Sequence, residues 1–235
     1  MAPKSNYGQF CPVAQAAEVV ASKWTPLILR EIMCGSTRFN DLRAGLSLIS
    51  PTQLTKRLRE LEFAGVIRHE TTAGSGAKRY VLTEAGEELR PIIEALGLWG
   101  HKNLRRELSE SELDPGYLMW DIRRSLDPAS LPFGGRTLVR FDFSGVPAAK
   151  RRWWLLFDDG QVDLCIKPPG GEEDLVVSGH VRDFINVWLG HLPLKDCLAN
   201  GRIRREGRSE LVASFPDWLG KSRVAVLAEE GARTR

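Results

Sequence analysis

Polar and basic side chains recur between residues 38 and 79, at positions from which they could hydrogen-bond to phosphates and to the edges of base pairs. Gln53 can pair with adenine and Lys56 with guanine. The candidate contacts are Arg38, Ser50, Thr52, Gln53, Lys56, Arg57, Lys78 and Arg79. These residue types make a nucleic-acid interface one hypothesis, and an ordinary solvated surface is the alternative.

A helix that begins after Ser50 is expected to position most of these side chains. Ser50 can act as its N-cap, and Pro51 stands at the first helical position, where proline is tolerated. Its apolar face follows helical spacing, with Leu54, Leu58 and Leu61. Gly65 can end the helix as the residue after the C-cap. The polar positions between the leucines are therefore predicted to face outward.

A short hairpin is predicted directly after this helix. Val66 to Arg68 reads as its first strand, and Lys78 leads into a second strand from Arg79 to Leu82. The glycines of Gly74-Ser75-Gly76 mark the loop tip between the strands. A helix that fits the major groove, followed by a basic hairpin, suits contact with a groove and the adjacent backbone.

Three shorter helices are predicted before this segment. The first opens at Cys11-Pro12-Val13, the second begins near Trp24, and the third carries Phe39 and Leu42 on its inner face. Helices joined by short turns and followed by a hairpin have the order of a winged helix-turn-helix.

Several separate motifs then resemble the HxlR-type winged helix-turn-helix transcriptional regulators, over about residues 8–105. The motifs are Cys11-Pro12-Val13, Lys23-Trp24-Thr25, Leu27-Ile28-Leu29-Arg30-Glu31, Arg38-Phe39-Asn40-Asp41-Leu42, Ile49-Ser50, Leu54-Thr55, Leu58-Arg59-Glu60-Leu61, Tyr80-x-Leu82-Thr83-x-x-Gly86 and Trp99-Gly100. The resemblance implies a homodimer that binds a double-stranded DNA operator and regulates transcription.

A long helix from Thr83 to Leu108, kinked at Pro91, is expected to follow the hairpin. Its apolar residues recur at near-helical spacing, at Leu89, Ile92, Leu96, Trp99 and Leu104. This stripe is long for so small a domain, so we interpret it as a homodimer seam. Packing of the stripe within its own domain is the alternative.

Cys11 is a candidate redox residue, because a cysteine at this position senses oxidants or electrophiles in some members of the resembled family. Such chemistry requires a lowered thiol pKa, as at a helix N-terminus or beside a cation. The sequence places Cys11 near a helix start, which permits this role. An inert, partly buried thiol is the alternative.

The second half reads as an α+β domain with a mainly antiparallel sheet, separated from the first by the polar segment Ser109–Pro115. Strands are predicted over residues 139–143, 153–157, 162–166 and 175–178, and helices over 183–189 and 194–200. A final helix is predicted over 209–219. The predicted domain limits are 1–110 and 116–227.

The later part of this domain resembles sterol carrier protein 2-like (SCP2-like) domains, over roughly residues 117–226. The motifs are Val176-Val177-Ser178, Phe184-x-x-x-Trp188-Leu189-Gly190 and Pro193-Leu194-x-x-Cys197-Leu198-x-x-Gly201-x-Ile203-x-x-Glu206-Gly207. The resemblance implies an α/β sandwich around an apolar tunnel for a hydrophobic small molecule. The candidate lining residues are Phe141, Phe143, Trp154, Leu156, Leu164, Trp188, Leu198, Phe215 and Trp218. An ordinary core is the alternative for each.

Composition limits the functional classes. The chain has 235 residues and a net charge of +3, and residues 1–110 carry the whole excess, with 15 Lys and Arg against 12 Asp and Glu. Cysteine and histidine spacing predicts no metal site, and no cofactor or catalytic motif is predicted. The sequence has no apolar segment long enough to cross a membrane and no apolar core of a secretion signal, which predicts a cytoplasmic location.

We therefore expect a dimeric transcriptional repressor and no enzyme, with control by a hydrophobic effector as a further hypothesis. The alternatives are a hydrophobic-molecule carrier with secondary DNA binding and a redox-responsive regulator that acts through Cys11.

Overall fold

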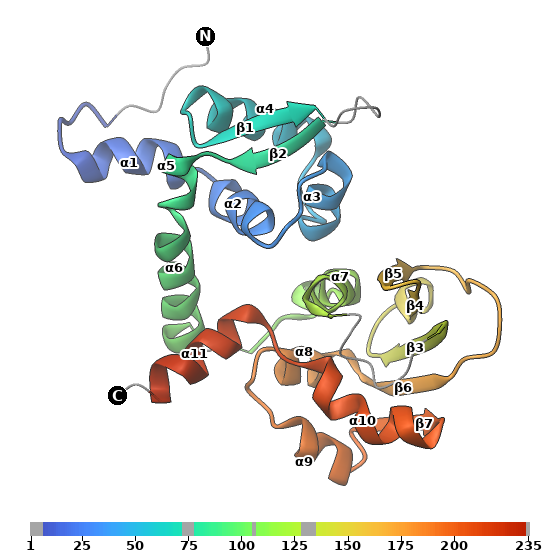
Figure 1. Ribbon diagram of the computed structural model, residues 1–235. Coiled ribbons are helices and arrows are strands. Elements are labelled where there is room, and N and C mark those ends of the chain that lie inside the picture. The colour runs from blue at the N-terminus through green and yellow to red at the C-terminus, as the bar shows by residue number, and fades with distance from the viewer. Residues whose placement is uncertain (1–6, 72–77, 105–106, 128–134, 234–235) are drawn as a thin grey trace. The chain divides into compact units, whose positions relative to one another are not determined.

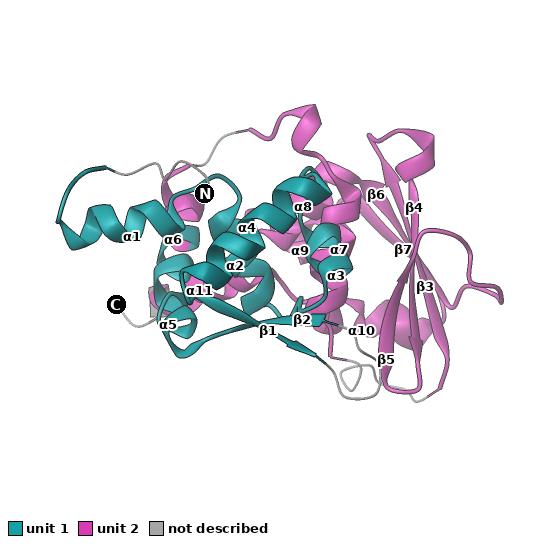
Figure 2. Cartoon of the chain, turned by 90° about the horizontal axis from the view of Figure 1, so that it is seen from above, with its two compact units in different colours: residues 1–97 teal, residues 98–235 magenta. Residues whose placement is uncertain are grey.

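The computed structural model describes residues 7–71, 78–104, 107–127 and 135–233 (Figure 1). The chain divides into two compact units, unit 1 over Met1–Gly97 and unit 2 over Leu98–Arg235 (Figure 2). The division falls within helix α6 (Arg90–Asn103). The limits predicted from the sequence, 1–110 and 116–227, assign all of α6 to the first domain, and they remain a prediction.

Unit 1 contains four helices and then a two-stranded hairpin, which is the predicted winged helix-turn-helix order. Its elements are α1 (Pro12–Val20), α2 (Thr25–Met33), α3 (Phe39–Gly45), α4 (Pro51–Phe63), β1 (Ile67–Thr71), β2 (Lys78–Leu82) and α5 (Glu84–Glu87). β1 and β2 are antiparallel, with Ile67 opposite Leu82 and Thr71 opposite Lys78. The inner faces of α2, α3 and α4 form one core, and Ile67 and Leu82 join it from the hairpin.

Helix α4 begins and ends where its sequence predicts. The Ser50 hydroxyl oxygen accepts a hydrogen bond from the Gln53 amide at 3.2 Å. At the other end, the Val66 amide donates to the Leu61 carbonyl at 3.0 Å. This chain reversal requires the positive φ of 71° at Gly65, which glycine adopts at little cost. Capping at both ends therefore holds α4 in one register against the core.

The helix predicted from Thr83 to Leu108 is two helices, which corrects the expectation of a single kinked helix. Thr83 caps α5, and its hydroxyl accepts from the Gly86 amide at 3.1 Å. Pro91 has no amide proton to donate to the turn before it, so α5 ends at Glu87 and α6 starts at Arg90. The second helix also ends earlier than predicted, at Asn103.

Unit 2 is built on a five-stranded sheet with the order β5-β4-β3-β6-β7. The strands are β3 (Thr137–Ser144), β4 (Arg152–Asp158), β5 (Gln161–Cys165), β6 (Leu175–His180) and β7 (Ile203–Gly207). β3 and β6 are parallel, and the other three pairs are antiparallel. The sheet is therefore mainly antiparallel, as predicted.

Helices supply the other layer of unit 2 (Figure 2). They are α7 (Pro115–Ser125), α8 (Val181–Trp188), α9 (Leu194–Ala199), α10 (Ser209–Leu219) and α11 (Arg223–Arg233), with short 3-10 turns η1 (Glu110–Glu112) and η3 (Ala148–Lys150). The core contains Phe141 and Phe143 from β3, Phe184 from α8 and Phe215 from α10. Alternate residues of β3 thus point into the helical layer.

Helix α11 was not expected, because residues 209–219 were predicted to form the last helix. Gly220 ends α10 with a φ of 68°. The Ser222 amide then donates to the Trp188 carbonyl at 2.9 Å, and the Ser222 hydroxyl accepts from Ala225. This contact with the last residue of α8 stands at the start of the new helix.

Candidate DNA-binding surface

The outer face of α4 carries most of the predicted base-contacting residues. Thr52, Gln53 and Lys56 are exposed, whereas Leu54, Leu58 and Leu61 are buried on the opposite face. The outer face therefore has the amide, hydroxyl and ammonium groups that base edges require. Their predicted exposure is confirmed, and their contact with DNA remains a prediction.

Arg57 and Lys56 share a carboxylate on the same helix. Arg57 Nη1 lies 2.6 Å from Glu60 Oε2, and Lys56 Nζ lies 4.0 Å from Glu60 Oε1. Arg57 is also more buried than Lys56. Exposed helical ion pairs contribute only a few tenths of a kcal/mol, roughly. An approaching phosphate or base could therefore displace Glu60 at low cost.

Hydrogen bonds to Thr37, in the turn before α3, hold the hairpin. Two of the predicted DNA contacts, Arg79 and Arg38, lie next to this residue. The Tyr80 amide donates to the Thr37 carbonyl at 2.7 Å, and Arg79 Nε donates to the Thr37 hydroxyl at 3.2 Å. Arg38, the next residue, is exposed at the start of α3. Thr37 therefore links β2 to the helix-turn-helix, a contact that sequence reasoning missed.

Lys78 and Arg79 are exposed at the start of β2, as predicted. The register places Lys78 opposite Thr71 and Arg79 opposite Glu70. The predicted loop tip, Gly74-Ser75-Gly76, lies outside the described residues. The hairpin thus presents two adjacent cations on its second strand.

A second link joins the hairpin to the C-terminal turn of α4. His69 Nδ1 of β1 lies 2.6 Å from Glu62 Oε1. Tyr80, directly opposite His69, is partly buried there. Burial raises the pKa of the Tyr80 phenol, and the Glu62 carboxylate raises it further, while Arg59 acts in the opposite direction. The phenol is therefore neutral at physiological pH, and these contacts hold the hairpin against α4.

Beneath this surface lies a buried carboxylate that sequence reasoning did not identify. Glu31 of α2 has no solvent exposure. Its Oε1 accepts from Arg30 at 2.6 Å, and its Oε2 accepts from the Ser36 hydroxyl at 3.1 Å. Arg30 also donates to the Gly45 carbonyl at the end of α3. A side-chain carbon at Gly45 would lie 2.0 Å from the carboxylate, so glycine is required there. Glu31 thus fixes the geometry between α2 and α3.

Apolar side chains remain exposed along α6. Ile92, Leu96 and Trp99 are each more than half exposed and follow helical spacing on one face. Leu89 and Ile93 instead pack against the core of unit 1. The predicted stripe is therefore divided between an inward face, which packs on the core, and an outward face, which is more than half exposed.

The nine predicted ligand contacts do not lie on one face of the unit 2 sheet. Phe141, Phe143, Trp188, Phe215 and Trp218 form part of one core, and Leu164 and Leu198 pack against it. Trp154 and Leu156 of β4 point to the opposite face, where their register partners are Arg140 and Leu138. Trp154 Nε1 donates to Glu173 there at 3.2 Å. Trp154 and Leu156 therefore cannot line the same cavity as Phe141.

Cys11 is the N-cap residue of α1 and is half-buried. Its predicted place at a helix start is confirmed, and its redox role remains a prediction. Among the described residues, acidic, cysteine and histidine side chains do not gather in a group that could hold a metal ion. Every helix in the same ranges is too short or too polar to cross a bilayer.

Known proteins resemble this chain over its first half. Residues 19–108 match the HxlR-like helix-turn-helix family. The uncharacterized HTH-type transcriptional regulator YvaP of Bacillus subtilis is 31% identical over 96 residues, which cover 40% of this chain and 89% of YvaP. YdeP, another uncharacterized HTH-type transcriptional regulator of Bacillus subtilis, is 38% identical over 93 residues, which cover 39% of this chain and 73% of YdeP.

A solved structure of the redox regulator HypR in its reduced form also matches. It is 32% identical to this chain, covers 40% of this chain and 95% of its own, and has a TM-score of 0.39. The family match ends at residue 108, so the SCP2-like likeness of the second half stays a proposal.

Proposed function

The chain belongs to the HxlR-like helix-turn-helix family of transcriptional regulators, and from that premise we propose that it is a homodimeric repressor. In this proposal each protomer inserts α4 into the major groove of one half of a two-fold operator. The observation that carries it is the outer face of α4, where Thr52, Gln53 and Lys56 are exposed on a capped helix. Gln and Lys are residues that read adenine and guanine.

The hairpin supports the proposal with a second, nonspecific contact. Lys78 and Arg79 are exposed, and Thr37 holds their strand to the helix-turn-helix. Cations on a strand fixed relative to α4 can neutralise backbone phosphates while α4 reads bases. Arg38, exposed at the start of α3, is proposed as a further phosphate contact.

Dimerisation is proposed through the outward face of α6. Ile92, Leu96 and Trp99 would otherwise leave a row of large apolar side chains in water. A two-fold dimer covers the same face on both protomers. It also presents two α4 helices, whose spacing must match one helical turn of DNA, about 34 Å.

Repression is the simplest regulatory outcome of such binding. A dimer that occupies an operator within a promoter excludes the polymerase without a further interaction. Activation would require an additional surface for the polymerase. Promoter activity measured with and without the protein tests this proposal, because a repressor lowers transcription and an activator raises it.

Unit 2 is proposed to be the regulatory part, with an SCP2-like sandwich and a hydrophobic effector as the finer hypothesis. Its sheet and helices enclose an aromatic core, which supports the likeness. The alternative is a carrier of hydrophobic molecules whose DNA binding is secondary. Mass spectrometry of compounds that co-purify with the native protein distinguishes the two, if followed by DNA titration in the presence of the compound found.

Gln53→Ala is expected to relax operator specificity at one base pair in each half-site. A good side-chain contact to a base discriminates by roughly 1–3 kcal/mol, and alanine cannot make it. Selection of binding sites from a random DNA pool measures the change. Gln161→Ala, an exposed glutamine of β5 in unit 2, is the matched control. An unchanged selected sequence for Gln53→Ala would rule out base reading by this residue.

Lys78→Ala is expected to weaken binding to all DNA sequences alike. Loss of one phosphate contact lowers the slope of log affinity against log salt by about one unit. DNA titrations at several salt concentrations measure this slope, with Lys195→Ala in α9 as the control. A loss confined to one operator position would mean that the hairpin reads bases.

A further inference from the structure

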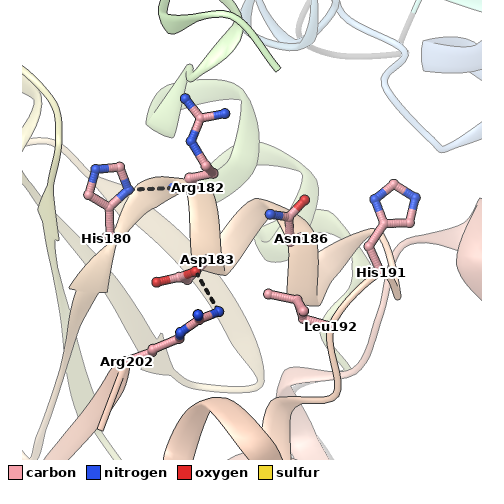
Figure 3. Close-up of a pocket in the computed structure, with 7 residues that line it drawn as sticks. All are labelled: His180, Arg182, Asp183, Asn186, His191, Leu192 and Arg202. Carbon is pink, nitrogen blue, oxygen red and sulfur yellow. Dashed lines mark hydrogen bonds and ion pairs between the residues drawn. The ribbon is translucent and has the colours of Figure 1, made fainter. Parts of the chain in front are cut away.

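A pocket of about 720 Å³, lined by polar side chains and by apolar surface, opens on the surface of unit 2 (Figure 3). It lies where β6 leads into α8 and where β7 begins. Its walls include His180, Asp183, Asn186, His191, Leu192 and Arg202. The volume falls in the range typical of small-molecule sites, roughly 300–1,000 Å³. No residue predicted from the sequence to bind a ligand contributes to these walls.

Arg202 is the cation of this pocket that remains available to a ligand. Its Nη1 lies 3.7 Å from Asp183 Oδ1, which is longer than the usual length of an N–H···O bond, about 2.7–3.2 Å. Its side chain is 54% exposed. Arg182 also borders the pocket, but it donates to the Leu108 carbonyl at 2.6 Å and to Glu110 at 2.9 Å, and Figure 3 shows it pointing away from Arg202.

Asn186 supplies an amide donor to the same pocket. It lies one helical turn after Asp183 on the same side of α8, and its backbone carbonyl fixes the next loop by accepting from the His191 amide at 2.8 Å and the Leu192 amide at 3.2 Å. The Asn186 side-chain amide lines the pocket (Figure 3). A guanidinium and an amide that line the same pocket are donors suited to the oxygens of a carboxylate or phosphate.

The other walls of the pocket suit a small apolar group of a ligand better than a second charged group. Leu192 gives an apolar wall, and the His191 ring stacks on His101 with centroids 5.0 Å apart and planes at 23°. His180 is held in place because its Nδ1 accepts from the Arg182 amide at 3.2 Å. The Asp183 carboxylate lies next to Arg202, so it would repel an anionic ligand and compete with it for the guanidinium.

We propose that this pocket binds a small oxyanion, a carboxylate or phosphate with a compact apolar body, through Arg202 and Asn186. The ligand displaces Asp183 from Arg202. His191 stacks on His101, which lies in the last turn of α6. A ligand that moves His191 would therefore also move the end of the helix to which dimerisation is assigned above. This last link rests on the proposed function, whereas binding itself does not.

The experiment titrates the full-length protein, without DNA, with butyrate and separately with methyl phosphate at constant ionic strength. Nuclear magnetic resonance follows the Asn186 side-chain amide and the Arg202 Nε proton. Saturable shifts of both signals are expected. Saturation by butyrate alone identifies a carboxylate site, and saturation by methyl phosphate alone identifies a phosphate site.

Three variants make the result specific to the pocket. Arg202→Gln is expected to weaken binding at least tenfold, roughly, because a charge-assisted contact is lost. Asp183→Asn is expected to tighten binding by removing the competing carboxylate. Arg204→Gln, an exposed arginine of β7 that is not among the residues lining the pocket, is the control and is expected to leave affinity unchanged.

Absence of saturation with both probes would overturn the proposal, as would equal weakening by Arg202→Gln and Arg204→Gln. Neither result would bear on operator binding by α4, which is measured separately. Conversely, saturable binding in a protein with no operator affinity would support the pocket and remove the regulatory role.

Discussion

Leu96→Asp is expected to convert the dimer into monomers and to lower operator affinity about 100-fold or more. Leu96 lies on the outward face of α6 and is 53% exposed in the single chain. In the proposed dimer this face is buried against its own copy, where two carboxylates would be desolvated without partners. Each protomer would then bind a half-site alone, and linked binding of two sites typically contributes 10²–10⁴-fold, on the order of this loss.

Light scattering coupled to gel filtration measures the first effect, as a fall in molar mass to the 26.3 kDa of one chain. A DNA titration with a two-half-site operator measures the second. Ile166→Asp is the matched control, because Ile166 is also apolar and 70% exposed but lies directly after β5 in unit 2. A variant that stays dimeric would show that the dimer forms elsewhere.

Glu31→Ala is expected to destabilise unit 1 by about 3 kcal/mol. Breaking a buried ion pair costs roughly 3–5 kcal/mol, and the lower figure applies because Arg30 keeps partial access to water. The change also leaves the Ser36 hydroxyl without its carboxylate acceptor and opens a cavity beside Gly45. Since α3 leads into α4, the loss is expected to loosen the helix-turn-helix.

Hydrogen exchange of the α2 and α4 amides, measured at increasing urea concentration, gives the free energy of unfolding of unit 1 without interference from unit 2. Glu87→Ala is the control, because its ion pair with Arg90 is exposed and should contribute about 1 kcal/mol or less. Glu31→Gln keeps the shape of the side chain and one hydrogen-bond acceptor. Its loss of unfolding free energy should therefore fall between those of Glu31→Ala and Glu87→Ala. An equal, small cost for Glu31→Ala and Glu87→Ala would contradict a structural role for the buried carboxylate.

The contrast between the two units explains which predictions succeeded. In α4, every boundary signal is local: Ser50 caps three residues ahead, the leucines repeat each turn, and Gly65 reverses the chain. The sequence alone was therefore enough to predict the helix, its buried face and its exposed face. The same holds for the pairing of β1 with β2, which a short loop connects.

Local patterns failed where distant segments decide the outcome. Alternation along β4 separates Trp154 and Leu156 from their neighbours, but only the assembled sheet shows which face the helices cover. Pro91 indicated a kink, and the structure gives two helices, because proline cannot donate an amide hydrogen bond to the turn before it. The error at Trp154 and Leu156 comes from reading one strand without the surface on which it packs.

The sequence by itself determined the winged helix-turn-helix, the position of its polar helix face and the mainly antiparallel sheet of the second unit, because these follow from short-range spacing and capping. Only the tertiary structure decided that Glu31 is buried, that Thr37 anchors the hairpin and that Leu96 remains outside the core. It also brought Asn186 and Arg202 to one pocket. These residues are separated by turns and strands, and their proximity depends on how whole elements pack.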